Sequence, residues 1–153
     1  YKLFRLNQIP ETFFAYLEDV DIDFRAQLAG FKCLFVPKAR LYHIGSATAG
    51  KRSAFSFRLM IKNHYHLILK NYPAARLLTS LPKIAYSEIR FAAAALKYHF
   101  ARDYLQALLQ ALIESPAMVR KRRQIQRSRK VDLKYLDRII ESKFSYKPIF
   151  SKK

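Results

Sequence analysis

The spacing of hydrophobic positions along the chain changes at about residue 53. Before that point, apolar residues recur at helical spacing ahead of Gly30, which predicts a short amphipathic helix over 20–29. The residues with this spacing are Val20, Phe24 and Leu28. The β-rich run 31–37 ends in a proline and predicts a strand, and 41–43 predicts a second extended piece. A helix that alternates with strands indicates an α/β fold for this part of the chain.

After residue 53 the pattern is helical only. Ser53 is a candidate N-cap for a helix that continues to about Lys70 and ends before Pro73. A second segment runs to Leu81, and a further helix is expected over about 83–100.

The next helix is predicted from a leucine-rich stripe between Tyr104 and Ile113, and we expect it to stop near Pro116. A last short pattern begins at Leu133. The chain therefore divides into an α/β part and a mostly α-helical extension, with expected bounds of 1–52 and 53–153.

Charge is distributed unevenly between these parts. The chain has a net charge of +18, yet residues 1–36 hold four Lys/Arg against five acids, and the remainder holds 25 against six. Such a basic surface favours anionic partners, namely nucleic acid, anionic lipid headgroups or nucleotide diphosphates. The single cysteine, Cys33, excludes a disulfide framework and fits a reducing, cytosol-facing location. The longest charge-free run, 104–113, is too short to span a bilayer.

Four of the eleven acids lie within six residues: Glu18, Asp19, Asp21 and Asp23. Like charges this close repel each other, so the cluster needs a compensating partner. A helix N-terminus, a metal ion or a role as proton acceptor would each explain it. Asp21 and Arg25 are spaced i, i+4 with the acid first, which is the favoured order for an ion pair on a helix.

The stretch around these acids resembles the second half of bacterial family-2 glycosyltransferases of the rhamnosyltransferase-like kind, which have the GT-A fold. The resemblance begins with Phe13-Phe14-Ala15-Tyr16-Leu17-Glu18-Asp19-Val20-Asp21. It continues through Leu28-Ala29-Gly30, Val36-Pro37, Tyr42-His43, Gly45-Ser46-Ala47-Thr48, Lys70-Asn71-Tyr72-Pro73 and Arg120-Lys121-Arg122-Arg123. The chain departs from the family at Gln8-Ile9-Pro10-Glu11, where Gly-Phe-Asp-Glu is usual. Since the chain starts at Tyr1 in mid-pattern, we interpret it as the C-terminal part of a longer enzyme.

The resemblance implies a Rossmann-like GT-A portion over about 1–50 and a role for each acid. Asp19 would be the general base that takes the proton of an acceptor hydroxyl, and Glu18 would orient the acceptor or the loop. The implied reaction moves a sugar, with inversion, from a nucleotide-sugar donor to a lipid-linked surface glycan. Asp21 and Asp23 would instead serve the helix and Arg25, and the chain alone would be inactive.

A divalent cation, Mg²⁺ or Mn²⁺, is the implied cofactor, with most of its ligands upstream of Tyr1. His43 would complete its shell, although a lone histidine at a strand end is more often structural. Ser46, Thr48 and Lys51 would close over the donor diphosphate, against the alternative of an ordinary surface loop.

His64 and His66 lie two residues apart in a helical pattern. Residues at this spacing face different sides of a helix, so we expect no metal site there.

The helices after Ser53 carry the expected anion-binding residues: Lys83, Arg90, Lys97, Arg120, Lys121, Arg122 and Arg123. Aromatic residues interleaved with these bases suit an anionic membrane surface, and we expect a peripheral location at the cytoplasmic face of the cell membrane. The alternative is a non-enzymatic basic module that binds nucleic acid or anionic membrane; we rank nucleic acid lower because the chain has no recognisable nucleic-acid motif.

Overall fold

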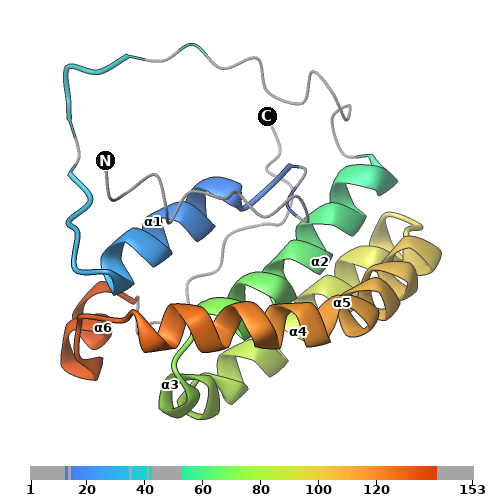
Figure 1. Ribbon diagram of the computed structural model, residues 1–153. Coiled ribbons are helices and arrows are strands. Elements are labelled where there is room, and N and C mark those ends of the chain that lie inside the picture. The colour runs from blue at the N-terminus through green and yellow to red at the C-terminus, as the bar shows by residue number, and fades with distance from the viewer. Residues whose placement is uncertain (1–12, 14, 35, 41, 43–52, 141–153) are drawn as a thin grey trace.

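The computed structural model describes residues 13, 15–34, 36–40, 42 and 53–140. Its elements are all helices, arranged around the long pair α2 and α5 (Figure 1). In chain order they are α1 (Glu18–Leu28), α2 (Ala54–Asn71), α3 (Ala74–Thr79), α4 (Leu81–Lys97), α5 (Ala101–Arg127) and α6 (Leu133–Ile139).

The expected α/β fold is wrong, and with it the expected Rossmann-like portion over about 1–50. The described residues before 53 contain one helix and no strand. The described residues of the run after Gly30 form no strand, and their apolar side chains Leu34 and Val36 are 81% and 57% exposed. A β-prone run becomes a strand only when another strand pairs with it, and no described segment does so here.

The predicted helix α1 is confirmed, but its buried face differs from the prediction. Its inward positions are Asp21, Arg25 and Leu28, whereas Val20 is 42% exposed. Gly30 ends the helix in a left-handed conformation, with φ of 88°. The prediction from hydrophobic spacing was therefore wrong about the buried face, because Asp21 and Arg25 lie there in place of Val20 and Phe24.

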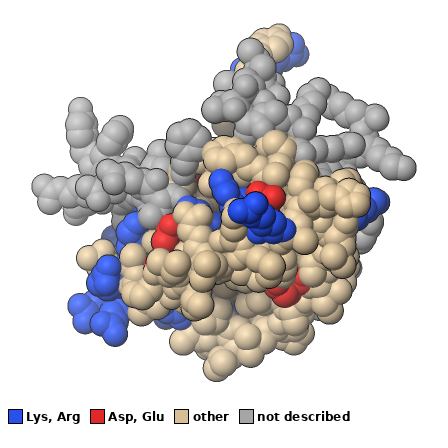
Figure 2. Space-filling model, turned by 90° about the vertical axis from the view of Figure 1, so that its right-hand side faces the viewer, with Lys and Arg blue, Asp and Glu red and all other residues tan. Residues whose placement is uncertain are grey.

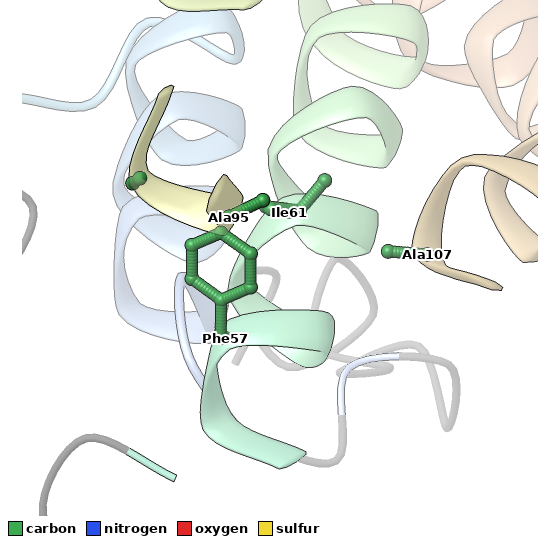
Figure 3. Close-up of a cluster of buried hydrophobic side chains, with 5 residues drawn as sticks. Phe57, Ile61, Ala95 and Ala107 are labelled. Carbon is green, nitrogen blue, oxygen red and sulfur yellow. The ribbon is translucent and has the colours of Figure 1, made fainter. Parts of the chain in front are cut away.

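The core lies between α2, α4 and α5. Its fully or largely buried members are Phe57, Ile61, Ala94, Ala95 and Ala107. Figure 3 shows the Phe57 ring of α2 lying against Ala95 of α4, with Ala107 of α5 on the other side of Ile61. Alanine at the α4 and α5 positions lets the helix backbones approach closely around the two large side chains of α2.

The ends of α2 match the prediction. The Ser53 side chain accepts a hydrogen bond from the backbone N–H of Ser56 at 3.1 Å, which confirms it as the N-cap. The helix ends at Asn71, two residues before Pro73.

The expected stop near Pro116 is wrong, since α5 continues through it to Arg127. Proline removes one backbone hydrogen bond, but Pro116 is exposed while Ala111 and Met118 on either side of it are buried. The packed face of α5 thus continues across the proline, and this packing offsets the single lost bond.

The C-terminal helix α6 contacts the end of α1, as seen at the left of Figure 1. The Tyr135 hydroxyl and the Gln27 side-chain oxygen are 3.0 Å apart, within hydrogen-bond distance. The backbone N–H of Lys130 donates to the carbonyl of Leu28 at 2.9 Å. Segments more than 100 residues apart are thereby joined.

A buried polar cluster connects α1 to α2. We call it the Asp21 cluster; its members are Asp21, Arg25, Lys70 and Asn71, none of which is more than 8% exposed. Asp21 Oδ1 lies 2.6 Å from Lys70 Nζ and accepts a hydrogen bond from Asn71 Nδ2 at 2.7 Å. Its Oδ2 accepts from Arg25 Nε at 3.0 Å, which confirms the predicted i, i+4 pair.

Replacing Asp21 should strongly destabilise the protein. In Asp21→Ala the cations of Lys70 and Arg25 stay buried without their carboxylate, and breaking such a pair costs about 3–5 kcal/mol. Asp23→Ala, two residues further along α1 and exposed, is the matched control and should change the free energy of unfolding by less than ~0.5 kcal/mol. Urea unfolding followed by circular dichroism measures both, and equal midpoints for the two variants would contradict this role of Asp21.

Candidate functional site

The chain enters α1 through a strained elbow. Tyr16 and Leu17 have φ values of 70° and 66°, a left-handed conformation that side chains other than glycine rarely adopt. The Asn63 side chain of α2 holds this elbow, because its Nδ2 donates to the carbonyls of Ala15 at 2.8 Å and Tyr16 at 2.9 Å. Consecutive strained residues persist only where surrounding structure fixes them, and they concentrate at functional sites.

The elbow presents the first turn of α1, where the four clustered acids have different environments. Asp21 is fully buried, whereas Asp19 and Asp23 are exposed. Asp19 accepts a hydrogen bond from the backbone N–H of Val20 at 2.8 Å. Glu18 is partly buried, and its Oε2 is shielded from water with no hydrogen-bond partner among the described residues. At the start of the helix, the exposed carboxylate of Asp19 therefore lies next to the partly buried carboxylate of Glu18.

These acids do not converge into a metal site within the described part of the chain, where no group of three possible ligands was found. Both oxygens of Asp21 already meet Arg25, Lys70 and Asn71. The predicted ligand His43 and the predicted diphosphate contacts Ser46, Thr48 and Lys51 lie outside the described residues.

His64 and His66 contact different elements, as their spacing predicts. His64 packs edge-on against Phe91 of α4, with ring centroids 5.2 Å apart. His66 is fully buried, 6.2 Å from the Phe13 ring, and its Nε2 lies 3.6 Å from a carboxylate oxygen of Glu114. Burial lowers the pKa of both imidazoles to about 4. At His66 the carboxylate of Glu114 opposes this shift, while Lys62, Lys70 and Lys121 add to it.

Sequence reasoning missed three polar residues of α2 that position the site: Asn63, Lys70 and Asn71. Burial lowers the pKa of the Lys70 ammonium to about 8, although the nearby Asp21 carboxylate acts in the opposite direction. Its Nζ also lies 4.6 Å from the centre of the Phe13 ring, a cation–π contact. The available signal was the Lys70-Asn71 pair in the resemblance motif, which carried no expected role for either residue.

The predicted anion-binding residues are spread along α4 and α5. Arg90 lies over the Tyr86 ring at 5.8 Å and Lys97 over the Tyr98 ring at 5.6 Å. Lys83 and Lys121 are partly buried, whereas Arg120 and Arg123 are exposed. Arg122 turns inward, where its Nη1 donates to the carbonyl of Leu69 at 3.0 Å.

The outer sides of α4 and α5 expose large apolar residues. On α5 the exposed fractions of the four largest lie between 58% and 70%: Leu105, Leu109, Leu112 and Ile113. On α4 the corresponding residues are Leu81, Tyr86, Ile89 and Leu96. Figure 2, which faces the end of the molecule where α4 joins α5, shows a broad area with few charged groups. Large apolar side chains exposed in this way are common at interaction sites.

The two buried histidines should make stability depend on pH. They are neutral in the folded state down to about pH 4 but take up protons near pH 6.5 when unfolded. The unfolded state therefore binds more protons between these values, and the free energy of unfolding falls as the pH falls. We expect a loss of about 1–2 kcal/mol per histidine between pH 7 and 5.

Urea unfolding at several pH values measures this slope. The double variant His64→Phe/His66→Gln should flatten it, whereas His99→Asn, at an exposed position with φ of 59°, should keep it. An unchanged slope in the double variant would show that other groups control the acid sensitivity.

Within the described residues, no helix combines the length and the apolar character needed to cross a membrane. Comparison with known proteins found no matching family model, no matching curated protein and no matching solved structure.

Proposed function

We propose that this chain supplies the catalytic base of an inverting sugar-transfer reaction, as the acceptor-side part of a glycosyltransferase. The observation that carries the proposal is the separation of Asp19 from Asp21. One carboxylate is locked into the Asp21 cluster, and the other is exposed at a strained elbow. The resemblance of 13–48 to family-2 glycosyltransferases supports the same assignment.

In this reaction Asp19 accepts the proton of an acceptor hydroxyl as the hydroxyl oxygen attacks the anomeric carbon of a nucleotide sugar. The nucleotide diphosphate leaves from the opposite face, so the configuration inverts in a single displacement. Glu18, whose carboxylate is partly buried, would orient the acceptor beside Asp19. The described carboxylates do not fit a metal ion, and no step of this proposal uses one.

A second proposal concerns location: the helices α4 and α5 lie on an anionic membrane surface. Both helices expose large apolar side chains, and basic residues border them on α4 and follow them on α5. Apolar side chains at headgroup depth with flanking bases are typical of peripheral membrane helices.

Removing the proposed base should abolish most sugar transfer. We expect Asp19→Asn in the full-length protein to lower kcat by a factor of about 10²–10⁴, because the amide cannot accept the proton. Asp23→Asn, an equally exposed acid on the same helix, is the matched control and should retain activity. Transfer from nucleotide-sugar donors to a glycan acceptor, followed by nucleotide release, measures both. Near-normal turnover by Asp19→Asn would exclude this residue as the base.

Membrane binding should depend on the apolar face of α5. Leu109→Glu/Leu112→Glu should bind phosphatidylglycerol-containing vesicles at least about tenfold more weakly, because burying each leucine contributes about 1.5–3 kcal/mol. Leu34→Glu/Val36→Glu makes the same charge change at two exposed apolar residues elsewhere and should bind normally. Vesicle co-sedimentation beside a DNA gel shift, both across salt, tests this. Strong DNA binding without vesicle binding would favour the nucleic-acid alternative.

A further inference from the structure

The end of α5 meets the starts of α3 and α6 at the lower left of Figure 1. Residues of these three segments line a cavity of about 350 Å³. Four of its lining residues are polar, and we call them the polar wall: Arg122, Arg123, Gln126 and Arg129. The other four are Pro73, Ala74, Ala75 and Leu133, and most of the surface that the cavity exposes is apolar. We call this cavity the arginine pocket. None of its lining residues is acidic.

The cations of the pocket have few partners within the protein. None of Arg122, Arg123 and Arg129 forms an ion pair with a carboxylate in the described part of the chain. Nη1 of Arg129 is shielded from water and makes no hydrogen bond to the described residues. A shielded guanidinium N–H without an acceptor is costly, and an anion in the pocket would satisfy it.

Two lining residues are fixed by contacts with the end of α2. Arg122 donates to the carbonyl of Leu69, and Gln126 Nε2 donates to the carbonyl of Asn71 at 2.8 Å. These bonds attach the last turns of α5, which carry Arg123, to the end of α2. A pre-organised wall lowers the entropy cost of binding a ligand.

The nearest acids along the chain do not neutralise this wall. Asp132 accepts a hydrogen bond from the backbone N–H of Tyr135 at 2.7 Å, and so caps α6. Asp137 forms an ion pair with Arg76 of α3. Neither carboxylate forms an ion pair with Arg122, Arg123 or Arg129 in the described part of the chain.

We propose that the arginine pocket binds a phosphate ester, with the phosphate on Arg123 and Arg129 and the apolar part of the ester against Pro73, Ala75 and Leu133. Planar guanidinium groups match phosphate oxygens in bidentate geometry. The ligand is either a lipid headgroup in a bilayer or a soluble phosphate ester. This site is independent of the sugar-transfer reaction assigned to Asp19.

The test compares two double variants of equal charge. Arg123→Gln/Arg129→Gln removes two cations of the pocket, and Lys38→Gln/Arg40→Gln removes two exposed cations outside it. The probes are inorganic phosphate, dioctanoyl phosphatidic acid below its micelle concentration, and phosphatidylcholine vesicles containing long-chain phosphatidic acid. Isothermal titration calorimetry measures the soluble probes, and co-sedimentation measures the vesicles, at one fixed salt concentration.

We expect the unmodified chain to bind dioctanoyl phosphatidic acid more tightly than inorganic phosphate, because the apolar wall contacts the acyl chains. The pocket variant should lose at least about tenfold in affinity, and the control variant less than about twofold. If the pocket variant loses binding of the soluble probe, the ligand is a soluble ester. If the unmodified chain binds only the vesicles and the pocket variant loses this binding, the ligand is a lipid headgroup. Equal losses in both variants, or no loss in either, would overturn the proposal.

A second variant keeps the test valid if the pocket variant does not fold. Ala75→Glu places a carboxylate on the exposed wall of the pocket, where it should occupy the arginines and displace the probe. Ala85→Glu on α4 makes the same change at an exposed position outside the pocket and should bind normally. Asp19→Asn should also bind the probe normally, which separates this site from the proposed catalytic base.

Discussion

The carboxylate of Asp21 is the group on which the arrangement of these helices depends. It lies 2.6 Å from Lys70 Nζ and 3.0 Å from Arg25 Nε, and all three residues are at most 8% exposed. None of these charges could remain buried without the others. Because Asp21 lies near the start of α1 and Lys70 near the end of α2, the ion pair fixes one helix on the other. Residues two apart on a helix are separated by about 200°, so an inward Asp21 directs Asp19 outward.

The last turn of α2 receives contacts from both α1 and α5. The Asp21 cluster reaches it from α1, and the Tyr72 ring just after it stacks on Phe24 with centroids 5.5 Å apart. From α5, Arg122 and Gln126 donate to its carbonyls. The C-terminal carbonyls of a helix carry partial negative charge, which favours these donors. The same contacts that cap α2 therefore hold the polar wall of the arginine pocket, so the pocket and the α1 elbow depend on one helix.

Local signals in the sequence predicted the helices well and the strands badly. The Ser53 cap, Pro73 and Gly30 act on their own neighbours, and each marks a helix end in the structure. The predictions of a strand over 31–37 and of a helix end at Pro116 were wrong because both features depend on distant parts of the chain. A strand needs a second strand to pair with, and none is found among the described residues. The helix continues because the packed face of α5 extends past the proline. The Asp21–Arg25 pair was predictable from i, i+4 spacing, but the Asp21–Lys70 contact joins residues 49 positions apart. A lysine in a helical pattern is normally exposed, so nothing local indicated that Lys70 is buried.

Three of the six acids after residue 36 have partners outside the last turns of α5. Of the six acids after residue 36, Glu114 lies beside Lys62 and His66, Asp137 pairs with Arg76, and Asp132 caps α6. Within the described residues, the bases between 120 and 130 form no ion pair with a carboxylate. The exposed residues of α5 are mainly apolar before Pro116 and mainly cationic after it. An apolar surface is stabilised by acyl chains and a cationic one by phosphate, and a membrane interface offers both within a few ångströms.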